Sequence, residues 1–196
     1  MPRMQAGDYR SKRERIKDAA AALFADKGFH GTSIVDIAKA CNTVKSRLYY
    51  YFPSKNQLLY EIIKDHALFL QDELEPIMKD VDIDAREQLE NYARTLLGIN
   101  VKYRNQHTLI LGELDALSFE QNKEVSLLIR RTIESLYPSL LEINPTLQKH
   151  MYFPTAMMFV GMINWTHTWF DGSGDVSVEG FAKLLCTTFL DGFSKS

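Results

Sequence analysis

The stretch Gly31-Thr-Ser-Ile-Val-Asp-Ile-Ala-Lys-Ala-Cys-Asn-Thr-Val-Lys-Ser-Arg-Leu-Tyr-Tyr-Tyr-Phe-Pro-Ser-Lys55 contains two short helical patterns joined by a turn. Ser33 is a favourable N-cap residue, and Asp36 three positions later resembles the second half of a capping box that opens the first helix. Asn42 tolerates the left-handed backbone conformation that a tight turn needs, and the residues from Lys45 to Phe52 predict a second helix. Two short helices joined in this way form a helix-turn-helix.

Outside this stretch the apolar residues also recur at helical spacing. A helix is predicted over residues 11–27, with Gly28 in the position of a C-cap glycine. A long helix is expected from Ser54 to Glu75, because Pro76 discourages continuation. Further helices are predicted over residues 85–102, 108–117, 120–141, 145–170 and 178–193, with a kink or break at Pro138 and at Pro154. No run alternates as a strand would, so we predict an all-α fold.

The charge of the chain is distributed unevenly. Residues 1–55 contain eleven Lys and Arg against five Asp and Glu, a formal charge of +6, whereas the remainder carries −8. We predict a three-helix helix-turn-helix domain over residues 1–53 and a larger helical domain over residues 54–196. The basic charge of the first part favours a polyanionic partner such as DNA, and a solvated basic face is the alternative.

The quoted stretch resembles the DNA-binding domain of the tetracycline-repressor (TetR) family of transcriptional regulators. The matching residues are the apolar pair of the first helix, four residues of the second helix and the cap that follows it: Ile37, Ala38, Leu48, Tyr49, Tyr51, Phe52, Ser54 and Lys55. The turn departs from the family pattern, with Asn42 and Thr43 in place of the usual Gly and Val. The resemblance implies a homodimeric repressor whose recognition helices read a pseudo-palindromic double-stranded operator.

The second helix carries the groups that a recognition helix needs. Hydrogen-bond donors at its N-terminal end can meet base edges, and an arginine such as Arg47 can pair with guanine through two hydrogen bonds. Three consecutive tyrosines point in different directions, so at least one faces DNA, although Tyr49 could instead pack against the first helix. The resemblance implies that Tyr51 and Lys55 contact phosphates. It implies the same for Thr32 and Ser33 at the start of the first short helix. The predicted DNA-contacting residues are Thr32, Ser33, Lys45, Ser46, Arg47, Tyr49, Tyr50, Tyr51 and Lys55.

The resemblance implies that the second domain binds an effector and forms the dimer. Residues 159–170 and the segment after them resemble the branch of the family that responds to acyl-CoA thioesters. The predicted effector-binding residues are Tyr92, Leu96, Tyr103, Phe119, Met158, Phe159 and Met162, each of which could instead be plain core. A bend at Pro154 is expected to aim the face from Met157 to Met162 into the domain. The predicted dimer interface, on near-heptad spacing, is Gly161, Trp165, Trp169, Phe181, Leu185, Thr188, Phe189 and Gly192.

Other classes of protein find little support in the sequence. It contains no nucleophile elbow, phosphate loop or dinucleotide fingerprint, and its five histidines are scattered, so we expect neither an enzyme nor a cofactor or metal site. Cys41 and Cys186 are expected to be buried thiols. No apolar stretch reaches membrane-spanning length and the N-terminus is polar, so a cytoplasmic protein is expected. A DNA-bound adaptor that recruits a protein and binds no effector remains the alternative function.

Overall fold

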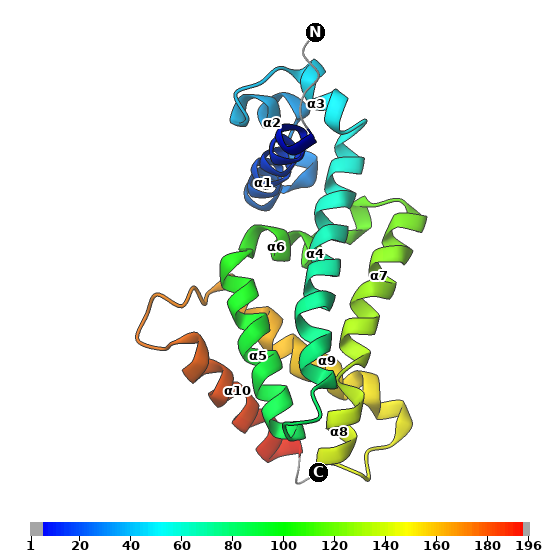
Figure 1. Ribbon diagram of the computed structural model, residues 1–196, viewed down its shortest axis with the longest axis vertical. Helices are drawn as coiled ribbons and strands as arrows, with labels where there is room; N and C mark the ends of the chain where they lie inside the picture. The colour runs from blue at the N-terminus through cyan, green and yellow to red at the C-terminus, as the bar shows by residue number, and fades with distance from the viewer. Residues whose placement is uncertain (1–5, 194–196) are drawn as a thin grey trace. The chain divides into compact units, whose positions relative to one another are not determined.

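The computed structural model describes residues 6–193, and within that range it contains α-helices, short 3-10 helices and no strand (Figure 1). This confirms the all-α prediction. The α-helices are α1 (Ala6–Gly31), α2 (Ile34–Ala40), α3 (Lys45–Tyr51), α4 (Lys55–Lys79), α5 (Ala85–Lys102), α6 (Arg104–Gly112), α7 (Phe119–Glu134), α8 (Tyr137–Ile143), α9 (Tyr152–Asn164) and α10 (Val178–Phe193). The 3-10 helices are η1 (Leu114–Ala116), η2 (Lys149–Met151) and η3 (Trp165–Thr168).

The chain folds into two compact units. The first unit comprises residues up to His66 together with Asn105–Val125, and the second comprises Ala67–Arg104 together with the residues from Ser126 onward. The first unit thus contains the predicted helix-turn-helix domain and adds the beginning of α4, α6, η1 and the beginning of α7. Both α4 and α7 contribute residues to both units.

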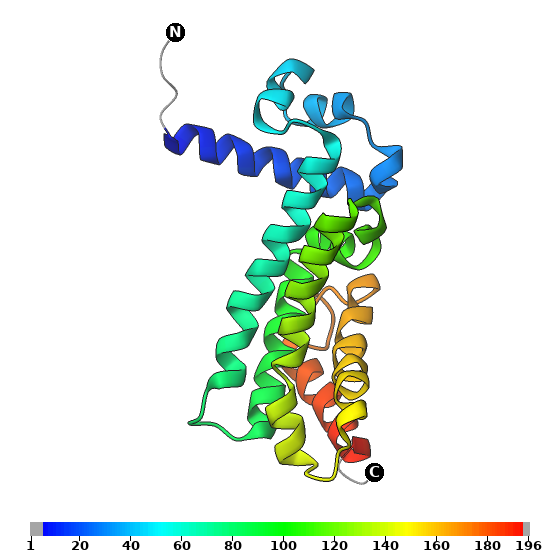
Figure 2. The same ribbon diagram turned by 90° about the vertical axis from the view of Figure 1, so that its right-hand side faces the viewer.

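In the first unit α1 packs against α2, and α2 packs against α3. Figure 2 shows α1 along its length. The fully buried side chains of Phe24, Ile37, Leu48 and Phe52 form the centre of this unit. Gly28 adopts a φ of 76°, which interrupts the helical geometry where the sequence placed a C-cap glycine. The three helices predicted for residues 1–53 are therefore present.

Ion pairs fasten α1 to the beginning of α4. The Arg13 guanidinium contacts the Glu61 carboxylate, and the ammonium of Lys17 lies 2.6 Å from a carboxylate oxygen of Asp65. Lys17 is itself buried, and a second carboxylate, that of Glu14, lies 2.7 Å from its ammonium. A buried ammonium requires such partners, because transfer of an unpaired charge out of water is costly.

Two buried histidines meet between α4 and α6. His66 Nε2 and His107 Nδ1 lie 3.3 Å apart, and both side chains are buried. Burial lowers the pKa of His66 from 6.5 to about 4, because a charged imidazolium loses its hydration there. His66 is therefore neutral in the folded chain near neutral pH.

We expect the chain to lose stability as the pH falls from 6.5 toward 4. The unfolded chain binds a proton at His66 in this range and the folded chain does not, so acid favours unfolding, by up to about 3 kcal/mol. Urea unfolding at a series of pH values measures the effect. His66→Gln removes the titrating group and should make the dependence shallower. An equally steep dependence in His66→Gln would rule out His66 as its source.

In the second unit α5 packs against α8, α9 and α10. Its core contains Tyr92, Leu89 and Leu97 from α5 together with Phe159 from α9 and Ala182 from α10. Cys186 on α10 is buried there, as predicted, and lies 3.5 Å from the carbonyl oxygen of Leu89. Cys41 in the first unit is only partly buried.

The prolines have effects that differ from the predictions in two places. Pro138 and Pro154 both lie in the first turn of a helix, α8 and α9, where the missing backbone donor costs nothing. Each helix begins one or two residues before its proline, but Met158 is not turned inward as predicted, because it is 63% exposed. That prediction was wrong. Pro76 does not end α4, which runs to Lys79. Pro76 has no backbone N–H to donate to the carbonyl of Asp72, four residues earlier. Both residues are exposed, so water can satisfy that carbonyl.

Candidate nucleic-acid interface

The capping box predicted at the start of α2 is formed. The Ser33 hydroxyl accepts a hydrogen bond from the backbone N–H of Asp36 at 3.2 Å, and the backbone N–H of Ser33 donates to the Asp36 carboxylate at 3.0 Å. The hydrogen bonds from Ser33 lower the pKa of the Asp36 carboxyl. Asn42 adopts a φ of 49°, and the backbone N–H of Thr43 donates to Ala38. The departures from the family pattern in the turn therefore leave its geometry intact.

The exposed side of α3 gathers donors and aromatic rings. Leu48 and Tyr51 face inward and are buried, which turns Lys45, Ser46, Tyr49 and Tyr50 outward, with Tyr50 68% exposed. The Lys45 ammonium lies 5.6 Å from the centroid of the Tyr49 ring. Arg47 is exposed as well. We define these five residues, Lys45, Ser46, Arg47, Tyr49 and Tyr50, as the recognition face.

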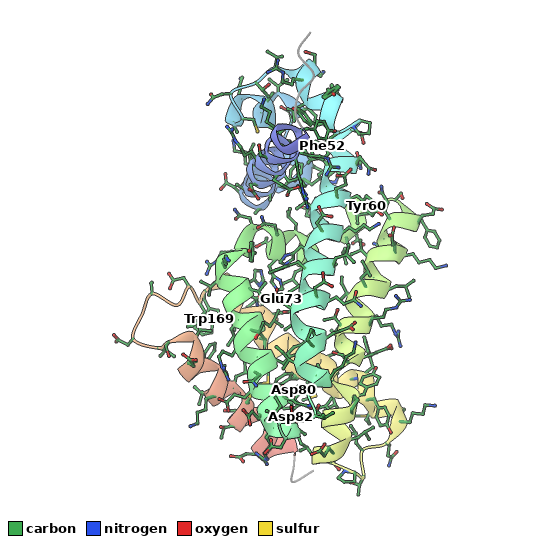
Figure 3. All side chains as sticks on the ribbon, in the orientation of Figure 1. Phe52, Tyr60, Glu73, Asp80, Asp82 and Trp169 are labelled. Atoms are coloured by element: carbon green, nitrogen blue, oxygen red, sulfur yellow. The ribbon has the colours of Figure 1, made fainter. Side chains whose placement is uncertain are left out.

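Aromatic contacts connect the beginning of α1 to the recognition helix. The Tyr9 ring lies 4.9 Å from that of Tyr51 and 6.0 Å from that of Tyr50, measured between centroids. Phe52, labelled in Figure 3, is buried beneath the guanidinium of Arg13, which lies 4.7 Å from the ring centroid. The sequence reasoning missed Tyr9, because it analysed the first helix only from Ser11 onward.

Three residues predicted to contact DNA make contacts within the first unit. Thr32 is buried and its hydroxyl donates to the carbonyls of Leu23 and Gly28 at 3.1 and 2.9 Å. The Tyr51 ring is buried against Tyr9. The Lys55 ammonium donates to the carbonyls of Phe29 and Thr32. These contacts give all three side chains a part in the stability of the first unit.

Lys55→Met is therefore expected to lower the free energy of unfolding. The ammonium donates 2.7 and 2.8 Å hydrogen bonds to the carbonyls of Phe29 and Thr32 and lies 4.1 Å from the Phe29 ring centroid. Its loss leaves two carbonyls without this partner, at a cost of about 1–3 kcal/mol in thermal or urea unfolding. Lys79→Met, at the exposed end of the same helix, is the control and should change stability by less than about 0.5 kcal/mol. Unchanged stability with a flatter salt dependence of DNA binding would instead support the phosphate contact.

Val44 is an exposed apolar residue that the sequence reasoning did not select. It is the N-cap residue of α3 and is 63% exposed at the end of the helix that carries Lys45 and Ser46. An exposed methyl group beside a recognition helix can contact the methyl group of thymine. The signal in the sequence that could have identified Val44 is an apolar residue directly before the hydrogen-bond donors Lys45 and Ser46.

The residues predicted to bind an effector do not all lie together. Tyr92, Leu96 and Phe159 are buried in the second unit, where the rings of Tyr92 and Phe159 lie 6.1 Å apart. Tyr103 is half-buried and contacts Phe69, with ring centroids 5.0 Å apart. Phe119 is 76% exposed and belongs to the first unit, and Met158 and Met162 are exposed. Phe119, Met158 and Met162 therefore do not lie in the interior of the second unit, where the prediction placed them.

The predicted dimer residues divide into two groups. Leu185 and Phe189 are buried within the chain, so their side chains belong to its own core. Trp165 is 69% exposed and Trp169, labelled in Figure 3, is 57% exposed, while Phe181 is half-buried beside Trp169. The small residues Gly161, Thr188 and Gly192 are exposed. We define the apolar face as the exposed residues of this region: Met157, Met158, Gly161, Met162, Trp165, Trp169 and Leu184.

Family profiles match most of the chain. Residues 16–62 match the profile described as "Bacterial regulatory proteins, tetR family", and residues 82–193 match "Tetracyclin repressor-like, C-terminal domain". The two matches cover the helix-turn-helix and most of the second unit. The chain belongs to the tetR family of bacterial regulatory proteins, and this family consists of DNA-binding regulators, which confirms that it is not an enzyme.

Individual relatives differ in how much of the chain they match. The biofilm operon negative regulator IcaR of Staphylococcus aureus is 42% identical over 52 residues, so the match covers 26% of this chain and only 28% of that regulator. The transcriptional repressor KstR2 of Rhodococcus jostii is 24% identical over 187 residues, which is 93% of this chain and 91% of that one.

Solved structures share the fold. A TetR-family regulator from Bordetella parapertussis superposes with a TM-score of 0.87 at 34% identity, over 91% of this chain and 94% of that one. AibR, solved in complex with isovaleryl coenzyme A and operator DNA, superposes with a TM-score of 0.79 at 23% identity, over 90% of this chain and 97% of that one. At that identity the likeness to AibR shows the fold alone. Among the described residues, no helix has the length and apolar character to cross a membrane.

Proposed function

We propose that the chain is a homodimeric transcriptional repressor that reads an operator with the recognition face of α3. The observation that carries this proposal is the exposed cluster of Lys45, Ser46, Arg47, Tyr49 and Tyr50 on a helix held in place by a formed helix-turn-helix. Lysine, serine and arginine donate hydrogen bonds to base edges and phosphates, and tyrosine hydroxyls contact sugars and phosphates.

A second copy of the chain is proposed to cover the apolar face. Two tryptophans and three methionines exposed in one region are unusual for an isolated protein surface, whereas aromatic residues and methionine are enriched in interfaces. The exposed glycines among them permit close approach of helices. A dimer places two recognition faces about one DNA turn apart, which matches a pseudo-palindromic site.

The effector is proposed to be an acyl-CoA thioester that binds in the second unit. The support is the resemblance of residues 159–170 to the thioester-responsive branch, together with the isovaleryl coenzyme A named for AibR. The interior residues Tyr92, Leu96 and Phe159, with Tyr103, remain the proposed lining. An adaptor that binds a protein and no small molecule is the competing proposal.

Affinity selection from a random duplex library tests the repressor proposal. We expect enrichment of an inverted repeat, and binding of that operator by two chains. Titration of the free and operator-bound forms with isovaleryl-CoA, with CoA as the control, then tests the effector. A thioester that releases DNA must bind the operator complex more weakly by the same factor, because coupling between sites is reciprocal. Equal affinity for both forms would eliminate release by this ligand, and no binding would favour the adaptor.

A further inference from the structure

A cleft in the first unit lies between α1 and the helix-turn-helix. Its volume is about 400 Å³, and it is lined by Lys12, Arg15 and Asp18 of α1, by Cys41 and Thr43 of the turn region, and by Arg47 of α3. Three cationic side chains therefore line the cleft against one carboxylate. The amide nitrogen of Gln106 lies 3.4 Å from that carboxylate, so Asp18 has a hydrogen-bond partner outside the cleft lining.

The two arginines of the cleft have no carboxylate partner among the described side chains. Arg15 and Arg47 are exposed, and neither forms an ion pair with a carboxylate of residues 9–192, whose side chains the structure describes. Other guanidiniums of the chain behave differently: those of Arg13 and Arg130 are paired with glutamates. A planar guanidinium matches the geometry of a phosphate group, and the Thr43 hydroxyl can donate a further hydrogen bond.

The position of the cleft indicates where the phosphate comes from. One wall of the cleft is α3, and Arg47 and Tyr51 on the α1 side of that helix belong to its lining. A helix fills the width of the major groove, so the two sugar-phosphate backbones pass along its two sides. DNA that engages the recognition face therefore brings one backbone along the side of α3 that faces α1.

We propose that this cleft binds a backbone phosphate of the operator, with Arg15 as its principal cationic ligand. The assignment rests on the proposed function, and it adds α1 to the DNA interface. Arg47 closes the cleft on the α3 side and is left to contact bases. A free phosphorylated metabolite would present the same chemistry, so the test must separate these two sources.

Arg15→Gln is the first test. It should weaken operator binding about tenfold at physiological salt, reduce the slope of log affinity against log salt by about 0.9, and leave base preference unchanged. Lys27→Gln is the matched control, because Lys27 is an exposed cation on the same helix that does not line the cleft. It should leave the slope unchanged. A slope for Arg15→Gln equal to that of the unsubstituted chain would overturn the proposal.

Cys41 provides a second readout inside the cleft. Its thiol is partly exposed whereas that of Cys186 is buried, so alkylation by iodoacetamide, located by peptide mass, reports on the cleft. Operator DNA should slow alkylation of Cys41 several-fold, and inorganic phosphate or AMP should not. Equal protection by phosphate or AMP would assign the cleft to a free ligand, and no protection by the operator would overturn the assignment. If the unsubstituted chain enriched no DNA sequence, the proposed repressor function itself would be wrong. That outcome is distinct from a failure of the cleft assignment in the Arg15→Gln or Cys41 experiment.

Discussion

Trp165→Glu is expected to convert the dimer to monomers and to lower operator affinity by at least about 100-fold. Trp165 is 69% exposed on η3 within the apolar face, between the exposed Met162 and Trp169. Tryptophan buries a large apolar area in an interface, and an unpaired carboxylate in its place must be desolvated when the second copy binds. Loss of the dimer leaves one recognition face per complex, which rarely gives enough affinity for a specific site.

Sedimentation equilibrium and operator titration measure the two effects of this substitution. Val81→Glu is the control, because Val81 is an apolar residue that is 91% exposed and lies outside the apolar face. It should remain dimeric with unchanged affinity. If Trp165→Glu also remained a dimer and bound the operator with unchanged affinity, the assignment of the apolar face to the dimer would be wrong.

Arg47→Ala should cost about 1–3 kcal/mol of operator binding, which is about fivefold to more than 100-fold in affinity, and should relax preference at one base pair in each half-site. The physical reason is that a guanidinium paired with guanine discriminates between bases, whereas a phosphate contact does not. Binding isotherms on a set of single-base operator variants measure the loss of preference. Lys39→Ala, an exposed cation of α2 outside the recognition face, is the control. A uniform loss across all variants would show that Arg47 contacts phosphate.

The helix-turn-helix could be predicted because local signals agree with one another there. The capping box of Ser33 and Asp36, the left-handed Asn42 and the C-cap glycine all appear in the structure. The effects of Pro76 and Pro154 on their helices were predicted less well. A proline disturbs a helix through the carbonyl four residues earlier, and its cost depends on whether water reaches that carbonyl or whether the proline lies in the first turn. Neither condition can be read from the sequence alone.

The candidate site was predictable in part for a related reason. Spacing along α3 indicates that the three tyrosines point in different directions, and the structure shows that Tyr51, three residues after the buried Leu48, is the one turned inward, where it packs against Tyr9. Lys55 looks like a phosphate ligand in sequence because its acceptors, the carbonyls of Phe29 and Thr32, lie more than twenty residues away.

The apolar residues of α10 posed a similar difficulty. This helix carries apolar side chains on more than one side: Leu185 and Phe189 enter the core of the chain, whereas Leu184 is exposed. Near-heptad spacing identifies an apolar stripe but does not say whether the chain itself or a second copy covers it. The tertiary packing of α5 against α10 supplies that answer for Leu185 and Phe189.

The most direct test of the proposed dimeric repressor is a selection from random duplex DNA followed by footprinting and measurement of the stoichiometry. We expect an enriched inverted repeat whose half-site centres lie about 34–36 Å apart or a multiple of that spacing, protected by two chains of this protein. Enrichment of no sequence above non-specific binding, or saturation of a single half-site by one chain, would contradict it.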